Sequence, residues 1–352
     1  AMNGDGCKAI DCRFINNTAK NGGATYQITA NGCNFTENTA TEYGGAMNGG
    51  SASNCTFKDN KAGISGDNTY NTNIPKPILI VYNFTSTYNS GDKLVFNFTT
   101  ASGTPISNAN ITIRIYKNDT LVGTYYALSG EGWVVKLDVG LYIAVCSIEN
   151  QAYEVEPANA TLTITQDSSK VTSSAVTTVY NGGKYLVVTL KDSKNRPISN
   201  VKVSINLNGV KTLTTDKNGQ VKLITNALVP KTYTAVISFD GNANYIKSST
   251  SVKVTVKKAT PKLTAKKKTF KKSVKTKKYT ITLKTNQNKA MKKAKVTLKI
   301  KGKTYKATTN AKGKAVFKIK KLTKKGKYKA TVTYKGNNCY NKVTKKVKIT
   351  VK

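Results

Sequence analysis

Three segments near the N-terminus repeat one pattern: CRFINNTAKNGGA at residues 12–24, CNFTENTATEYGGA at residues 33–46 and CTFKDNKA at residues 55–62. The cysteines that open them are 21 and then 22 residues apart. Short stretches of strand character, broken by glycine and asparagine at this period, are typical of a parallel β-helix, in which each turn of the chain stacks on its neighbour. We therefore predict that residues 1–77 form the last rungs of a right-handed parallel β-helix and a linker.

Two kinds of side chain recur at one place in every rung. They are the phenylalanines Phe14, Phe35 and Phe57 and the asparagines Asn17, Asn38 and Asn60. We expect the phenylalanines to stack inside and the asparagines to form a ladder of amides. The pairs Gly22-Gly23 and Gly44-Gly45 supply tight corners that side chains would obstruct. Because residues 1–4 repeat the sequence of residues 46–49, the chain is expected to open inside a larger solenoid.

A longer repeat follows. The segments YIAVC (142–146), YTAVI (233–237) and YKATV (328–332) are 91 and 95 residues apart. Around them, short alternating strands are separated by turn residues about every ten positions, which is typical of an antiparallel sandwich. The fold class is therefore all-β, with three immunoglobulin-like β-sandwich domains in tandem after the helix. Their predicted bounds are residues 78–167, 168–257 and 258–352.

Charge rises in steps along the chain. The net charge is 0 for residues 1–77, −4 for 78–167, +10 for 168–257 and +34 for 258–352. The last segment holds 34 lysines and no Asp, Glu, Arg or His. An ordinary soluble domain mixes both signs, whereas so many like charges repel one another unless a counter-anion is bound. This asymmetry predicts that the C-terminal domain binds a polyanion.

Alternation along the last domain places a set of lysines on the outward side of its strands. The lysines predicted to bind the polyanion, as a diffuse surface, are Lys295, Lys299, Lys301, Lys318, Lys320, Lys329, Lys335, Lys346 and Lys348. The aromatic residues of the same strands fall on the inward phase: Tyr279, Tyr305, Phe317, Tyr328 and Tyr334. Stacking platforms for bases are therefore not evident, and the pattern does not favour nucleic acid as the anion.

The composition excludes several reaction classes. Without histidine, neither a Ser-His-Asp triad, nor a Cys-His dyad, nor a His-ligated zinc site can form. The six cysteines contain no CxxC pair, so we expect no metal site and no cofactor, and we interpret the chain as non-enzymatic. No apolar run is long enough for a membrane helix, so membrane insertion is not expected.

The cysteines have several expected environments. Cys12, Cys33 and Cys55 lie one rung apart, close enough for disulfides, but their parallel Cβ vectors favour a ladder of free thiols. Cys146 occupies the position of apolar residues in the other two sandwich copies and is expected to be buried. The redox state of Cys7, Cys12, Cys33 and Cys55 and the role of Cys339 stay open.

Asn-X-Ser/Thr sequons, which are possible N-glycosylation sites, occur only in the weakly charged half of the chain. They start at Asn16, Asn34, Asn54, Asn83, Asn97, Asn110, Asn118 and Asn159. This confinement is what an outward, glycan-bearing segment and an inward, wall-embedded segment would show.

The GGA and FxxN motifs of the first 65 or so residues resemble the repeats of polymorphic outer-membrane proteins and, more closely, those of adhesin-like proteins of methanogenic archaea. Residues 78–352 resemble the bacterial-type Ig-like repeats of surface proteins. The resemblance implies an extracellular protein of the cell surface or cell wall. Its β-helix would face an unknown cell or glycan ligand, and its basic end would hold an anionic, pseudomurein-like wall polymer.

Two other functions remain open from the sequence. The chain could be the accessory C-terminal region of a carbohydrate-active β-helix enzyme whose catalytic rungs lie upstream. It could also be a module that binds polyanions such as extracellular nucleic acid. Clustered acids on one face of the preceding rungs would favour the enzyme, whereas monotonous GGA and FxxN rungs would favour adhesion.

Overall fold

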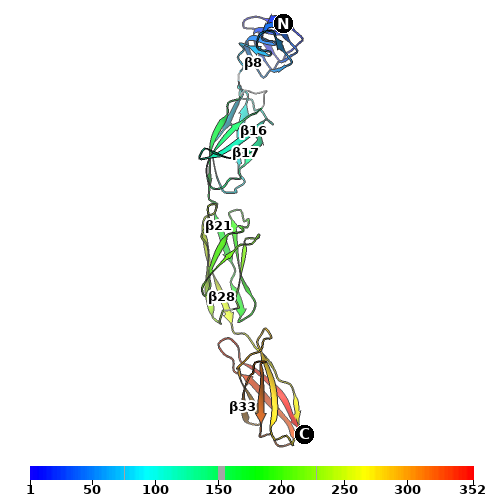
Figure 1. Ribbon diagram of the computed structural model, residues 1–352, viewed down its shortest axis with the longest axis vertical. Coiled ribbons are helices and arrows are strands. Elements are labelled where there is room, and N and C mark those ends of the chain that lie inside the picture. Colours follow the sequence, from blue (N-terminus) through cyan, green and yellow to red (C-terminus); the bar gives the residue numbers. More distant parts are fainter. Residues whose placement is uncertain (75, 150–154, 227) are drawn as a thin grey trace. The chain divides into compact units, whose positions relative to one another are not determined.

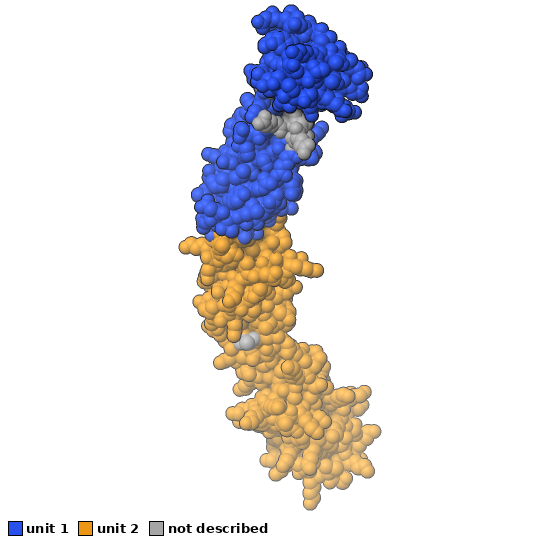
Figure 2. Space-filling model, turned by 45° about the horizontal axis from the view of Figure 1, so that its top comes forward, with its two compact units in different colours: residues 1–166 blue, residues 167–352 orange. Residues whose placement is uncertain are grey.

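The computed structural model describes residues 1–74, 76–149, 155–226 and 228–352. Within them every regular element is a β-strand, so the predicted all-β class is confirmed (Figure 1). The chain divides into two compact units, residues 1–166 and residues 167–352 (Figure 2). The described residues contain no helix that is long and apolar enough to span a membrane.

The N-terminal rungs consist of parallel strands in three sheets, as a β-helix requires. One sheet contains β1 (Met2–Asn3), β2 (Lys8–Ile10), β5 (Thr25–Asn31), β8 (Met47–Ser53) and β11 (Thr69–Tyr70). The second contains β3 (Arg13–Ile15), β6 (Asn34–Thr36) and β9 (Thr56–Lys58). The third contains β4 (Thr18–Asn21), β7 (Thr39–Tyr43) and β10 (Lys61–Ala62). Equivalent residues pair from rung to rung, for example Phe14 with Phe35 and Phe35 with Phe57.

Both predicted ladders are present in the rungs. The Phe35 ring is stacked between the rings of Phe14 and Phe57, with centroid separations of 4.8 and 5.1 Å. The Asn17 Nδ2 donates to Asn38 Oδ1 at 2.9 Å, and the Asn38 Nδ2 donates to Asn60 Oδ1 at 2.8 Å. These contacts repeat because each rung presents the same side chain at the same backbone position.

Corners of the rungs use two backbone devices. The residue before each ladder asparagine has a left-handed conformation, with φ of 51° at Asn16, 55° at Glu37 and 53° at Asp59. At another corner the rungs approach so closely that a Cβ on Gly23 would lie 2.1 Å from the carbonyl oxygen of Gly45. Glycine is therefore required there by the neighbouring rung.

Each of the three sandwiches has its own buried apolar core and a five-stranded sheet. In the first sandwich this sheet has the order β13 (Phe84–Thr87), β20 (Ala158–Thr165), β19 (Gly140–Ser147), β16 (Asn110–Lys117), β17 (Thr120–Leu128). The second has β22 (Val176–Val179), β28 (Ser248–Lys257), β27 (Thr232–Phe239), β24 (Lys202–Asn206), β25 (Val210–Thr214). The third has β30 (Lys268–Phe270), β36 (Val343–Val351), β35 (Gly326–Tyr334), β32 (Lys295–Ile300), β33 (Lys303–Thr308).

Smaller sheets complete each sandwich. The first has β12 (Ile78–Val81) with β15 (Phe96–Thr99), and β14 (Lys93–Leu94) with β18 (Trp133–Val134). The second has β21 (Ser169–Ser173), β23 (Tyr185–Asp192) and β26 (Gln220–Ile224). The third has β29 (Lys262–Thr264), β31 (Lys277–Lys284) and β34 (Lys314–Ile319).

Two features show that the three sandwiches are copies of one domain. In every five-stranded sheet the first strand in sequence pairs in parallel with the last, as β13 does with β20, β22 with β28 and β30 with β36. In every copy a tyrosine hydroxyl donates to the carbonyl four residues earlier. These bonds are Tyr142 to Asp138 at 3.0 Å, Tyr233 to Val229 at 3.0 Å and Tyr328 to Lys324 at 2.8 Å. This is the geometry of a tyrosine corner, which fixes the chain crossing at one end of a sandwich.

Candidate polyanion interface

The outer face of the five-stranded sheet of the third sandwich contains only lysine and threonine. We call it the Lys/Thr face. Its lysines are Lys295, Lys299, Lys306, Lys327, Lys329, Lys346 and Lys348. Its threonines are Thr269, Thr297, Thr304, Thr308, Thr331, Thr333, Thr344 and Thr350. The inward residues of the same strands form the core, with Leu298 and Val332 fully buried.

Threonines form the floor of the Lys/Thr face. A row of threonines crosses the sheet, since Thr344 pairs with Thr333 and Thr333 pairs with Thr297. The hydroxyls of Thr333 and Thr344 are 3.3 Å apart, and the Thr297 hydroxyl donates to the Thr333 carbonyl at 3.4 Å. The central threonines are half-buried, whereas every lysine of the face is exposed. The exposed lysine ammonium groups therefore surround a central area of half-buried threonine hydroxyls.

Unbalanced positive charge is visible in the pairing of the third sandwich. Three directly opposed cross-strand pairs are lysine against lysine: Lys262 with Lys284, Lys278 with Lys318, and Lys329 with Lys348. Like charges at such positions destabilise a sheet. Repulsion from the Lys321 ammonium also lowers the pKa of Lys303. The domain has no acidic side chain to neutralise these groups.

The other parts of the chain do contain ion pairs. In the rungs, Lys20 lies 3.2 Å from Glu42, and in the second sandwich Arg196 lies 2.7 Å from the buried carboxylate of Asp192. The third sandwich has no carboxylate of its own, so any anion that pairs with its lysines comes from outside the domain.

The structure places the lysines predicted from sequence on different surfaces. Lys295, Lys299, Lys329, Lys346 and Lys348 lie on the Lys/Thr face. Lys318 instead lies on the outer face of the three-stranded sheet. Lys301 is in the turn after β32, Lys320 follows β34 and Lys335 follows β35, so these three lie outside the strands.

Sequence reasoning missed two members of the Lys/Thr face, Lys306 and Lys327. Lys306 pairs with Thr297, and Lys327 pairs with Thr350. The signal that could have found Lys327 is the alternation of Lys327 and Lys329 around Tyr328. One lysine is buried: the Lys277 ammonium donates to the Val274 carbonyl at 2.8 Å.

Aromatic residues of the third sandwich point inward as the sequence predicts. Tyr279, Phe317 and Tyr334 are buried, and Tyr305 and Tyr328 are half-buried against the core. Burial raises the pKa of Tyr279. Because no aromatic ring occupies an outward strand position of the Lys/Thr face, that face offers no platform on which bases could stack.

Most of the predicted sequon asparagines are exposed. These are Asn16, Asn54, Asn83, Asn97, Asn110, Asn118 and Asn159. The exception is Asn34, which is half-buried and whose Oδ1 accepts a hydrogen bond of 2.6 Å from the Thr56 hydroxyl. The Oδ1 of Asn83 also accepts a bond, from the Thr161 amide at 2.9 Å.

All six cysteines are free thiols in this structure. In the rungs, the Cys12 amide donates to Cys33 Sγ at 3.4 Å, and Cys33 is fully buried while Cys12 and Cys55 are half-buried. Burial raises the pKa of Cys55 to about 11 and that of Cys146 to about 12. These thiols are therefore poor nucleophiles.

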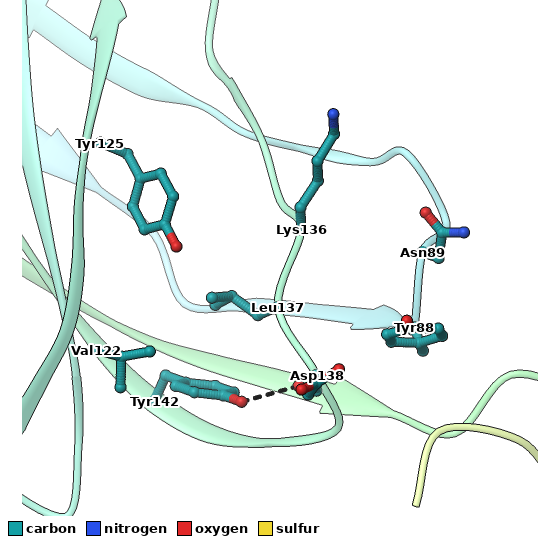
Figure 3. Close-up of a pocket in the computed structure, with 8 residues that line it drawn as sticks. All are labelled: Tyr88, Asn89, Val122, Tyr125, Lys136, Leu137, Asp138 and Tyr142. Atoms are coloured by element: carbon teal, nitrogen blue, oxygen red, sulfur yellow. Dashed lines mark hydrogen bonds between the residues drawn. The ribbon is translucent and has the colours of Figure 1, made fainter.

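A small hollow of about 270 Å³ lies on the first sandwich. Figure 3 shows the rings of Tyr88, Tyr125 and Tyr142 around it together with Lys136 and Asp138. The Tyr142 hydroxyl is bonded to the Asp138 carbonyl, which is the tyrosine corner common to all three copies. The hollow thus borders a structural motif. Among the described residues, no cluster of three or more His, Cys, Asp or Glu side chains could hold a metal ion.

Comparison with known proteins gives one short family match. Residues 11–27 match the model of the Chlamydia polymorphic membrane protein repeat. No curated protein matches the sequence. Several solved structures are similar to this chain at low sequence identity.

A structure concerned with host cell surface retention of a 1.5-MDa bacterial ice-binding adhesin is 14% identical, covering 79% of this chain and 99% of that chain with a TM-score of 0.27. Invasin, a bacterial integrin-binding protein, is 13% identical, covering 78% and 60% with a TM-score of 0.35. A Drosophila N-cadherin fragment is 10% identical, covering 80% and 77% with a TM-score of 0.26.

Proposed function

We propose that this chain is part of a non-catalytic cell-surface adhesin, and that its third sandwich retains it on an anionic, pseudomurein-like cell wall polymer. The rungs would then be exposed for adhesion to a cell or glycan, and the first two sandwiches would act as a stalk. The observation that carries the proposal is the third sandwich itself, whose lysines surround two sheets without one acidic side chain. The sequence resemblance to methanogen adhesin-like proteins supports an archaeal source and an extracellular location.

Multivalent attraction is the mechanism. An exposed ion pair contributes only about 0.2–1 kcal/mol. Many such pairs add up when both partners carry repeated charges, because after the first contact the others form at a high effective concentration. At physiological salt, exposed charges are screened beyond about 8 Å. Binding should therefore be tight at low salt and reversed by added salt.

The test is retention of the full chain on isolated acidic wall material over a series of salt concentrations. Replacing Lys299, Lys301, Lys329 and Lys335 together by Glu should cause release at much lower salt. Replacing any one of them by Ala should change retention by less than about fivefold, because one weak contact among many is lost. Retention that does not respond to salt, or no retention of the unaltered chain, contradicts the proposal.

A further inference from the structure

The second sandwich is an internal reference for the Lys/Thr face, because the two domains have the same strand order and matching registers. Ile205 pairs with Ile237 in one as Leu298 pairs with Val332 in the other. At the positions that match the Lys/Thr face, the second sandwich has two lysines, Lys202 and Lys253. It also exposes Val210 and Val236 there, with exposed fractions of 63% and 51%.

Five positions change to lysine between the two domains. In order, Asn206, Thr212, Thr232, Thr234 and Ser251 of the second sandwich correspond to Lys299, Lys306, Lys327, Lys329 and Lys346 of the third. The two exposed valines become Thr304 and Thr331. The change therefore adds charge and removes every apolar side chain from this face while the core pairing is kept.

The opposite face gains fewer lysines. On the three-stranded sheet the second sandwich has outward lysines at Lys170, Lys191 and Lys222. The third sandwich has five: Lys262, Lys278, Lys284, Lys314 and Lys318. At the position of Lys222 it has an apolar residue in the middle of that face, Val316, which is 44% exposed. Of the two sheet faces, the Lys/Thr face therefore gains more lysines, from two to seven, whereas the opposite face goes from three to five.

The chemistry of the Lys/Thr face indicates which polyanion it fits. Threonine hydroxyls both donate and accept hydrogen bonds, whereas ammonium groups only donate. A chain of acidic sugars offers carboxylates for the lysines and hydroxyls for the threonines. Polyphosphate and the outside of a DNA duplex offer acceptors for the lysines and for threonine as a donor, but they offer few donors to threonine. The face also lacks outward aromatic rings on which bases could stack.

We propose that the Lys/Thr face is the binding surface for an acidic polysaccharide, which lies across β36, β35 and β32 over the row of threonines. This inference rests on the proposed function and narrows it from the whole domain to one face and one polymer class. The flat floor and the exposed lysines around it allow several sugar units to be contacted at once. The affinity for the polysaccharide therefore depends on the positions of the lysines as well as on their number.

The experiment uses the full chain and polygalacturonate as the probe. In the face variant, the five lysines take the residues of the second sandwich: Lys299→Asn, Lys306→Thr, Lys327→Thr, Lys329→Thr and Lys346→Ser. Because the same backbone positions carry these residues in the second sandwich, the variant is expected to fold. The matched control removes the same charge from the other face through Lys262→Thr, Lys278→Thr, Lys284→Thr, Lys314→Thr and Lys318→Thr. Circular dichroism verifies folding of both variants.

We expect the face variant to bind polygalacturonate about 30- to 100-fold more weakly, since five exposed ion pairs are lost. The control should lose less than about fivefold. Equal losses would overturn the assignment to this face but leave polyanion binding in place. Absence of binding by the unaltered chain would overturn the proposed function as well.

The polymer class is tested separately with a floor variant, Thr297→Val together with Thr331→Val and Thr333→Val. This change removes hydroxyls and leaves the charge unaltered. It should weaken binding to polygalacturonate by about tenfold and binding to polyphosphate by less than about threefold, because phosphate can only accept from the hydroxyls. The same loss for both polymers, or none for either, would overturn the assignment to acidic polysaccharide.

Discussion

The asparagine ladder gives the sharpest test of how the rungs are held together. Asn38 is fully buried, and its side chain takes part in four hydrogen bonds. Its Oδ1 accepts from the Asn17 amide at 3.0 Å and from the Asn17 side chain at 2.9 Å. Its Nδ2 donates to the Phe14 carbonyl and to Asn60 Oδ1, at 2.9 and 2.8 Å. The ladder thus joins three rungs through one residue.

Replacing Asn38 by Ala removes all four bonds at once. A typical intramolecular hydrogen bond contributes about 1 kcal/mol net, and partners left buried and unpaired add a further cost. We therefore expect the rungs to lose about 3–5 kcal/mol of stability. This is a large share of the total stability of most folded domains, which is about 5–15 kcal/mol. The variant should leave the rungs close to unfolding.

Two probes separate the rungs from the rest of the chain. Hydrogen exchange of peptides that cover β5 to β7 reports on the rungs, where protection should fall by at least about 100-fold. Fluorescence of Trp133, the single tryptophan, reports on the core of the first sandwich, which is separate from that of the rungs. Its unfolding midpoint in denaturant should not change.

The matched control for this substitution is Asn34→Ala. Asn34 belongs to the same rung, but its side-chain Oδ1 accepts a single hydrogen bond among the described residues, from the exposed Thr56 hydroxyl. Its loss should cost about 1 kcal/mol or less. If Asn38→Ala and Asn34→Ala reduce protection equally, or if Asn38→Ala has no effect, the ladder does not hold the rungs together.

Other outcomes follow from single positions. Gly23→Ala should destabilise the rungs by more than about 2 kcal/mol in hydrogen exchange, because the new Cβ meets the Gly45 carbonyl; wild-type protection would contradict the close approach. Tyr328→Phe should cost about 0.5–1.5 kcal/mol in denaturant unfolding, and no loss would show that the corner bond contributes nothing. At pH 8, iodoacetamide should label exposed Cys7 but not native Cys146, whose pKa is raised to about 12 by burial; mass spectrometry that finds Cys146 alkylated without unfolding would refute this.

Much of the fold could be predicted because the same residue type recurs at the equivalent position of each repeat. A phenylalanine and an asparagine recur in every rung, and a tyrosine recurs in every sandwich, so their partners follow from stacking or from local hydrogen bonding. The left-handed corner at Glu37 could not be predicted in this way. Asn16 and Asp59 are of residue types that are enriched in the left-handed conformation, whereas glutamate is not, although Glu37 adopts it here.

The candidate site was harder to predict than the fold. Alternation along a strand tells which side chains point outward, but it does not tell which of two sheets the strand joins. Lys318 and Lys329 look alike in sequence, yet β34 and β35 belong to opposite sheets. Lys306 and Lys327 join one face only because β33 and β35 both pair with β32. Which strands pair with one another cannot be predicted from the alternation within a single strand.

The contrast between the second and third sandwiches explains how one scaffold can carry so much charge. Their cores are filled by similar residues, as the fully buried Ile205 and Ile237 of one and Leu298 and Val332 of the other show. Outward positions of a sheet add little to that core, so lysine can replace serine, threonine or asparagine there without changing the packing. The cost is repulsion between neighbouring ammonium groups such as Lys329 and Lys348. Under the proposed function, a bound polyanion would relieve this repulsion in the folded domain, so the charges that weaken the free domain would stabilise the complex.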